Sequence, residues 1–390
     1  MEKYSAYRDP GTGIQPFLTP VPPPQAGNKL LFTAWYPFGV MLAAIRTLLV
    51  LVSTAAYIFI AHGVLSIFLI APPVHRLLSK IVTSLISRLI LFVIGYFWIP
   101  VEVISRKRSR GNTSQAWSPR AGDVIVSNWA SVVEILWLAF RFNPIFVLPV
   151  PETPVSHAPN TQLTPIAHTP GRRTGTGSAN IASTTRTASA QIPIIGFQTV
   201  SLLTMVRQTG LVPPFPSLTG HQPCSLEDIR RTAPRPLVVF PECTSSNGRG
   251  LLRFADVFKR STPVAEFTVF IMCVRYDPPT TFSPTPTLSV PSPSFNPLPH
   301  LFSLTTSITV PQISIRLLSP AESPSSPLFV ASEVIGDMSS KQDLLTEACA
   351  VLIAQTGKLK RMSMGWEDKA RFLDFYRGKR TCEEYARKTK

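Results

Sequence analysis

The chain of 390 residues is 45% hydrophobic, which is enough for a packed core in one large domain or two modest ones and excludes disorder throughout. Its 38 lysines and arginines exceed 22 aspartates and glutamates, and the net charge of +16 indicates an anionic partner such as membrane headgroups, a phosphorylated substrate or nucleic acid. The cysteines lie far apart without paired short spacings, so the sequence indicates neither a metal site nor a disulfide framework and fits a reducing environment: Cys224, Cys243, Cys273, Cys349 and Cys382.

Residues 1–37 form a polar, proline-rich lead that contains DPGTGIQPFLTPVPPPQ. A segment this irregular cannot form a core alone. We expect it to be either a tail or an arm packed on the surface of the folded protein.

A membrane anchor is expected over residues 38–103. Leu48–Ile70 runs for 23 residues without an aspartate, glutamate, lysine or arginine. As a helix it would be about 34 Å long, enough to cross a hydrocarbon core of about 30 Å. It starts too far from Met1 and is too long for a signal peptide. A second apolar stretch, Ile81–Val101, carries Arg88, which would cost about 3 kcal/mol at mid-bilayer. This stretch therefore either spans the membrane or lies in its interface.

The segment APPVHRLLSK joins the two apolar stretches, and its prolines end one helix and allow the chain to reverse. The basic run SRKRSR follows the second stretch, as is typical of the cytosolic side of a membrane. We therefore predict a helical hairpin with both flanks in the cytosol. The alternative is a buried pair of helices in a soluble protein.

Residues 104–328 alternate short apolar runs with amphipathic stretches, which indicates an α/β domain. Two segments interrupt the pattern. Residues 152–190 are dominated by small polar residues and proline, and Pro278–Pro327 contains twelve prolines in fifty residues. We expect the insertions 152–190 and 278–304 to be disordered or loosely packed, whereas SITVPQISIRLLS alternates well enough to be one more strand.

Residues 329–390 are expected to be a basic helical segment. Its last part, Lys358–Lys390, carries eleven basic against five acidic residues around several aromatic side chains. Such a tail either packs its aromatics on the domain or contacts a membrane surface.

The stretch PLVVFPECTSSNGRGLLRF is the most informative for function. A buried strand ends at Pro241, and Glu242 follows with a run of small polar residues. In open α/β sheets, ligands bind at the carboxyl ends of the strands, where backbone N–H groups together with Arg249 and Arg253 would suit a phosphate.

This block resembles the Phe-Pro-Glu-Gly-Thr block of the glycerophospholipid acyltransferases, which include lysophosphatidate acyltransferases and tafazzin-like enzymes. IVSNWASVVE stands where that family has Asn-His-x-x-x-x-Asp, Gly196–Arg207 resembles its second block, and FTVFIMCVRYDP resembles its apolar fourth block. The similarity covers about residues 120–280. With the stretches RDPGTGIQPFL and GWEDKARFLDFY included, the chain most resembles a fungal branch of the lysophosphatidate acyltransferases that is found on endoplasmic reticulum and lipid droplets. The resemblance implies a mixed sheet flanked by helices, after the membrane hairpin.

The family mechanism implies that the histidine takes a proton from the acceptor hydroxyl while the aspartate five residues on orients the ring. A helix brings the two together, because side chains lean back toward its first turn. Here Trp129 follows Asn128 at the histidine position, and Glu134 stands at the aspartate position. Indole cannot accept a proton at neutral pH. Glu134 or Glu242 would act as the base if burial raised its pKa.

The resemblance assigns Asn128, Trp129, Glu134 and Glu242 to catalysis. The family arginine that follows the threonine is replaced by Ser245, so Arg249, Arg207 or Arg253 would take the phosphate role. Cys243 stands where the family has a glycine, and a mechanism with its thiol as nucleophile is a further alternative, although no adjacent base is visible. The substrate-binding residues are expected to be Arg207, Cys243, Thr244, Asn247 and Arg249.

The sequence therefore predicts a membrane-bound acyltransferase that makes phosphatidate from lysophosphatidate and acyl-CoA, with acyl-CoA as co-substrate and no cofactor. The expected location is the endoplasmic reticulum membrane and lipid droplet, with the active domain facing the cytosol. The alternative is a catalytically degenerate homologue that acts as a lipid-binding or organelle-associated scaffold. Nucleic-acid binding is disfavoured, because the basic clusters flank membrane segments and no recognised binding motif is present.

Overall fold

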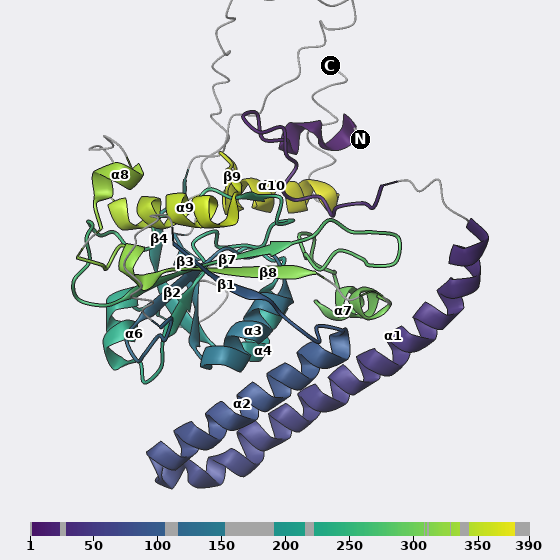
Figure 1. The fold of residues 1–390 in the computed structure, drawn as a ribbon, viewed down its shortest axis with the longest axis horizontal. Coiled ribbons are helices and arrows are strands. Elements are labelled where there is room, and N and C mark those ends of the chain that lie inside the picture. Colours follow the sequence, from purple (N-terminus) through teal and green to yellow (C-terminus); the bar gives the residue numbers. More distant parts are fainter. Residues whose placement is uncertain are drawn as a thin grey trace, which may run out of the picture.

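The computed structural model describes residues 2–23, 29–105, 116–152, 191–214, 222–307, 309, 312–327, 329–335 and 343–378. It has a seven-stranded sheet with helices on both faces and a long helical hairpin that projects from the domain (Figure 1). The α/β fold with a mixed sheet is thus confirmed. The insertion 153–190 and the basic run 106–110 lie outside the described residues.

The sheet has the strand order β1-β8-β7-β2-β5-β3-β4. Pairing is parallel for β1 with β8, for β2 with β5 and β7, and for β3 with β5, whereas β3 with β4 and β7 with β8 are antiparallel. The inner strands are continuous apolar runs because both of their faces are covered. The strands are β1 (Val101–Ile104), β2 (Val124–Ser127), β3 (Ile145–Pro151), β4 (Ile194–Val200), β5 (Leu237–Val239), β7 (Val269–Tyr276) and β8 (Ile313–Leu318). The expected strand in SITVPQISIRLLS is confirmed as β8.

Two apolar layers cover the sheet. Alternation along β2 sends Val124 and Val126 to one layer and Ile125 to the other. Helix α9 (Leu344–Gly357) packs on the first layer and α3 (Val132–Phe142) on the second. The shorter elements are α4 (Leu202–Gln208), α6 (Leu226–Thr232), α7 (Leu298–Thr305), α8 (Ala331–Ile335), α10 (Trp366–Tyr376), and the strand pair β6 (Gly250–Leu251) with β9 (Lys360–Arg361).

The hairpin consists of α1 (Lys29–Ile58), its continuation as a π-helical turn (Phe59–Gly63) and a 3-10 helix (Val64–Ile70), and α2 (Pro72–Ile94), which runs back beside α1 (Figure 1). Prolines occupy the first turn of α2, as expected for a reversal. Both helices are long and apolar enough to cross a membrane by length and composition. The expected hairpin is present, but α1 begins before residue 38, and residues 101–103 belong to β1 rather than to an anchor.

The hairpin is tied to the domain near its two ends. Arg46 of α1 donates to the Ser307 carbonyl at 2.7 Å, and Ser84 of α2 donates to the Phe140 carbonyl of α3 at 2.7 Å. Arg88 donates to the carbonyls that follow α2, at 3.0 and 2.7 Å. Its guanidinium is therefore hydrogen-bonded to backbone carbonyls at the end of its own helix.

The amino-terminal arm, residues 2–23, packs against α10. Phe17 is fully buried, and its ring lies 5.7 Å from that of Phe372. The Asp9 carboxylate accepts hydrogen bonds from the Ser363 backbone N–H at 2.9 Å and hydroxyl at 2.6 Å. Of the two alternatives for this lead, the packed arm is confirmed. Trp366 is also buried, so the α10 aromatics pack on the domain, and residues 379–390 lie outside the described residues.

The proline-rich segment 278–304 is ordered, and the expectation of disorder or loose packing there is wrong. Thr287 and Leu288 are 2% and 4% exposed, and the Leu288 N–H donates to the Ala130 carbonyl at 2.8 Å. Proline lacks a backbone donor and cannot join a sheet interior. Residues 286–288 instead lie against the start of α3, where the Leu288 N–H and the Pro286 carbonyl have partners outside the sheet, and the end of the segment forms α7.

Candidate functional site

The carboxyl ends of neighbouring parallel strands β2 and β5 bring the two resemblance blocks together. Asn128 and Trp129 follow β2, and Glu242 follows β5. The Trp129 backbone N–H donates to Glu242 Oε2 at 2.6 Å, and the Leu252 N–H donates to Glu242 Oε1 at 2.8 Å. Glu242 is 1% exposed. The structure thus brings the two blocks together, while the chemical roles of their residues stay predictions.

Asn128 makes a two-way amide contact with β7. Its Nδ2 donates to the Val274 carbonyl at 2.9 Å, and its Oδ1 accepts from the Val274 N–H at 2.8 Å. The side chain thus continues the pairing of β2 with β7 by one step after the strand ends. This geometry fixes the turn that carries Trp129 and leaves the amide engaged with the backbone.

Trp129 fills the position where the resembled family has its base. Its side chain is fully buried, and its ring lies 5.2 Å from that of Phe240 with an interplanar angle of 30°. Among the residues that the structure describes, the indole Nε1 has no hydrogen-bond partner. The ring is therefore a packing element in this conformation, and it offers no proton acceptor.

Glu134 closes a capping box at the start of α3. Its Oε1 accepts from the backbone N–H groups of Ala130 and Ser131, while the Ser131 side chain accepts from within the first turn. Its Oε2 accepts the hydroxyl of Tyr276. Burial raises the pKa of Glu134 to about 7, against the lowering effect of these donors. A group with this pKa exchanges protons near neutral pH, but Oε1 already serves the helix cap and Oε2 accepts from Tyr276.

Glu242 is the second buried carboxyl group of the site. Burial raises its pKa to about 8, while the N–H groups of Trp129 and Leu252 pull the pKa down. The nearby charge of Glu134 raises the pKa of Glu242, and that of Lys369 lowers it. The two glutamates therefore hold their protons more tightly than exposed carboxyl groups do.

The residues after Glu242 are committed to contacts within the protein. Thr244 Oγ1 donates to the Leu211 carbonyl at 2.6 Å, and Asn247 Nδ2 donates to the carbonyls of Gln15 and Leu18 at 2.7 and 3.0 Å. The side-chain amide of Asn247, which was expected to bind substrate, is thus hydrogen-bonded to the amino-terminal arm.

Cys243 stands in the left-handed region with φ of 59°, where the resembled family has a glycine. Its thiol is buried, and burial raises its pKa well above the usual value. A thiol that keeps its proton is a poor nucleophile, so the geometry disfavours the thiol mechanism.

The candidate arginines do not enter the buried cluster. Arg207 at the end of α4 and Arg249 before β6 are both exposed. Arg253 pairs with Glu367 at 3.2 Å. A phosphate held by Arg207 or Arg249 would therefore lie at the surface rather than beside Glu242.

Two charged or titratable side chains near the site were missed by the sequence reasoning. Lys369 of α10 is fully buried, and its Nζ donates to the Ser245 carbonyl at 2.6 Å. His300 of α7 has Nε2 3.1 Å from the Pro286 carbonyl, which also accepts the Ser131 hydroxyl at 2.6 Å. Burial lowers the pKa of His300. The sequence does give one signal for Lys369, because it lies three residues from both Trp366 and Phe372 and so shares their face of a helix. His300 has no motif around it.

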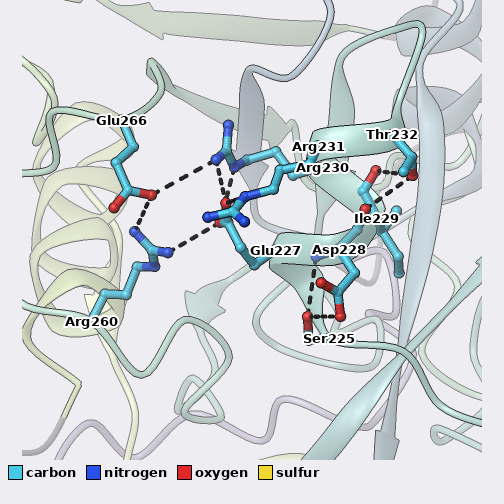
Figure 2. A network of polar contacts seen from close by, with 9 residues as sticks. All are labelled: Ser225, Glu227, Asp228, Ile229, Arg230, Arg231, Thr232, Arg260 and Glu266. Carbon is cyan, nitrogen blue, oxygen red and sulfur yellow. Dashed lines mark hydrogen bonds and ion pairs between the residues drawn. The ribbon is translucent and has the colours of Figure 1, made fainter.

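A cavity of about 190 Å³ lies elsewhere, between β4, α6 and residues 257–260. At its edge Arg230 and Arg260 both pair with Glu227, and Arg260 also pairs with Glu266 (Figure 2). Hydrogen bonds from Arg230 are the main cause that lowers the pKa of Glu227 to about 2. These ion pairs tie α6 to the chain before β7.

The described residues include no group of histidine, cysteine, aspartate or glutamate side chains that could hold a metal ion.

Comparison with known proteins gives one relevant similarity. A Schizosaccharomyces pombe protein named "Putative lysophosphatidic acid:oleoyl-CoA acyltransferase" is 28% identical over 148 residues, which cover 38% of this chain and 45% of that protein. The match thus spans less than half of the relative's length. No family model and no solved structure matches the chain. The similarity supports a general acyltransferase function.

Proposed function

We propose that the protein is a membrane-bound acyltransferase that transfers an acyl group from acyl-CoA to lysophosphatidate and yields phosphatidate. The main support is the hydrogen bond between the Trp129 N–H and Glu242, which joins the two resemblance blocks at the carboxyl ends of β2 and β5. The name of the S. pombe relative supplies the substrate classes. Acyl-CoA is the co-substrate in this proposal, and no cofactor is invoked.

In the proposed reaction the free hydroxyl of the lysolipid attacks the thioester carbonyl, the C–S bond breaks, and coenzyme A leaves as a thiol that takes up the hydroxyl proton. A base must carry that proton. Glu134 is one candidate, because its pKa of about 7 suits proton exchange at neutral pH. Glu242 is a second candidate, because burial raises its pKa to about 8. His300 is a third: if its Nε2 donates to Pro286, the neutral ring keeps Nδ1 as an acceptor.

The hairpin supports membrane attachment. Apolar side chains along α1 and its continuation are exposed, with Phe59 at 70% and Ile70 at 94%. A surface of this kind is unfavourable in water and favourable in lipid. Because the hairpin is tied to one domain near both ends, its two flanks lie on the same side in this proposal. We place that side in the cytosol, at the endoplasmic reticulum and lipid droplet.

A specific observation favours a second candidate function, a lipid-binding or organelle-associated scaffold without catalysis. Trp129 is fully buried, and the amide of Asn247 is occupied by the amino-terminal arm. Both features would fit a site that keeps the acyltransferase fold after losing its base. Acyl transfer measured with purified protein and several lysolipids separates the two candidates.

Glu242→Gln provides the site-specific test. We expect acyl transfer per folded protein to fall at least about 100-fold, because the amide cannot accept from both the Trp129 and Leu252 N–H groups, and misplaced site geometry costs this much. Glu266→Gln is the matched control, since it removes an exposed carboxylate far from the block. Wild-type activity in a folded Glu242→Gln protein would remove the proposed site from this position.

A further inference from the structure

Lys369 is a fully buried cation at the candidate site. It lies three residues after Trp366 and three before Phe372, and this spacing places all three on the buried face of α10. An ammonium inside a protein is costly unless it has polar partners. Its recorded partner is the Ser245 carbonyl at 2.6 Å, which lies 124 residues away in the sequence.

Ser245 occupies a decisive position in the block. It follows Thr244, where the resembled acyltransferases carry an arginine, and this chain has no arginine there. The Ser245 hydroxyl accepts from the Gly210 N–H at 2.9 Å and donates to the Leu288 carbonyl. With Lys369 on its carbonyl, Ser245 is held by three separate segments of the chain.

The charge of Lys369 also acts on Glu242. Lys369 lowers the pKa of Glu242, and Glu242 raises that of Lys369, against the larger and opposite effects of burial on each. The titratable groups around this pair are Glu134 of α3, Cys243 of the block and Cys273 of β7. Of the two described charges that act on the pKa of Glu242, Glu134 and Lys369, Lys369 is the positive one.

We propose that Lys369 is the positioning cation of this site: it fixes the Ser245 carbonyl and balances the carboxylate of Glu242, in place of the arginine that the block lacks. The proposal rests on the proposed acyltransferase function for its kinetic consequence. Its physical content, coupling between Lys369 and Glu242, holds whether or not the protein turns over substrate.

A double-mutant cycle tests the coupling. The free energy of unfolding is measured in detergent for wild type, Lys369→Met, Glu242→Gln and the double variant, between pH 6 and 9. Lys369→Met removes the positive charge that favours the ionised form of Glu242, Glu242→Gln removes the carboxyl group that favours the charged form of Lys369, and the double variant removes both. We expect the two substitutions to be non-additive by at least about tenfold in the folding equilibrium constant at pH 7.

The pH dependence gives a second readout. Without Lys369 the folded pKa of Glu242 rises further above its unfolded value, so stability is lost as pH rises toward that pKa. Lys369→Met should therefore lose stability with rising pH more steeply than wild type, and the double variant should not. Additive stabilities with parallel pH profiles would overturn the proposal.

Kinetics complete the test if wild type transfers acyl groups. Lys369→Met should lower kcat at least about tenfold, and Lys369→Arg should restore part of the loss because it restores the charge. Arg371→Met is the control, since it removes an exposed cation from the same helix. An inactive wild type with intact coupling would reject the proposed function alone; an active wild type without coupling would reject the role of Lys369 alone.

Discussion

At the scale of single residues, Trp129 decides how the site can work. Its indole packs on Phe240 and leaves Nε1 without a partner in the described part of the chain. Restoring a histidine there would not by itself rebuild a base with its orienting carboxylate. Glu134 would have to leave the helix cap and Tyr276 to reach the new ring.

Trp129→His is therefore expected to open a cavity and lower the free energy of unfolding by about 3 kcal/mol. Acyl transfer, normalised to folded protein, should rise less than about tenfold because Glu134 stays engaged. Trp137→His is the matched control, since it replaces a second buried indole, which lies on α3. A gain of 100-fold or more would show that the pocket lacks only its base.

Glu134 should make the fold sensitive to alkali. Its folded pKa of about 7 lies above the usual value of 4.5, so its favourable contribution is complete below pH 4.5 and is lost as pH rises through 7. Glu134→Gln keeps one oxygen for the cap and removes the titration. Urea unfolding at pH 5 and pH 8.5 should show a smaller difference in that variant than in wild type, and an unchanged difference would contradict this assignment.

At the scale of elements, the strands and most helices could be predicted because each is a short apolar run or an amphipathic stretch of ordinary length. The meeting of the two blocks was also predictable, since neighbouring parallel strands end at one edge. Residues 278–304 were not, because their backbone pairs with α3 and the block, and no periodicity records such contacts. The burial of Lys369 was not predicted for a similar reason. The excess of basic residues indicates a basic tail, but it does not show which single lysine side chain is buried.

The amino-terminal arm is an element whose attachment depends on few contacts. Asp9→Ala removes both hydrogen bonds to Ser363, and we expect trypsin to cleave after Arg8 at least about fivefold faster, as local opening becomes easier. The melting temperature of the domain should change little. Asp277→Ala serves as control, because Asp277 is an exposed carboxylate outside the arm and its contacts. Equal cleavage rates would show that the aromatic packing alone holds the arm.

At the scale of the whole molecule, the hairpin is the feature that supports the proposed membrane attachment. We expect the protein to stay in the membrane pellet after alkaline carbonate, and tags at either terminus to be digested by protease added to intact microsomes. A variant in which a short polar linker replaces residues 51–80 should instead be released from the membrane into the supernatant by alkaline carbonate. A protected amino-terminal tag beside an accessible carboxyl-terminal tag would leave a single crossing instead of a hairpin.

The parallel pairing of β1 with β8 has a consequence for biosynthesis. The hairpin and β1 are synthesised well before β8, and about 210 further residues must follow β1 before β8 is available to pair with it. At ordinary translation rates this takes roughly 10–40 s. During that interval the backbone N–H and C=O groups that β1 later pairs with β8 are without that partner. Nascent-chain quality control therefore meets this protein first at β1, and substitutions that slow pairing there should reduce its cellular yield before they affect the finished fold.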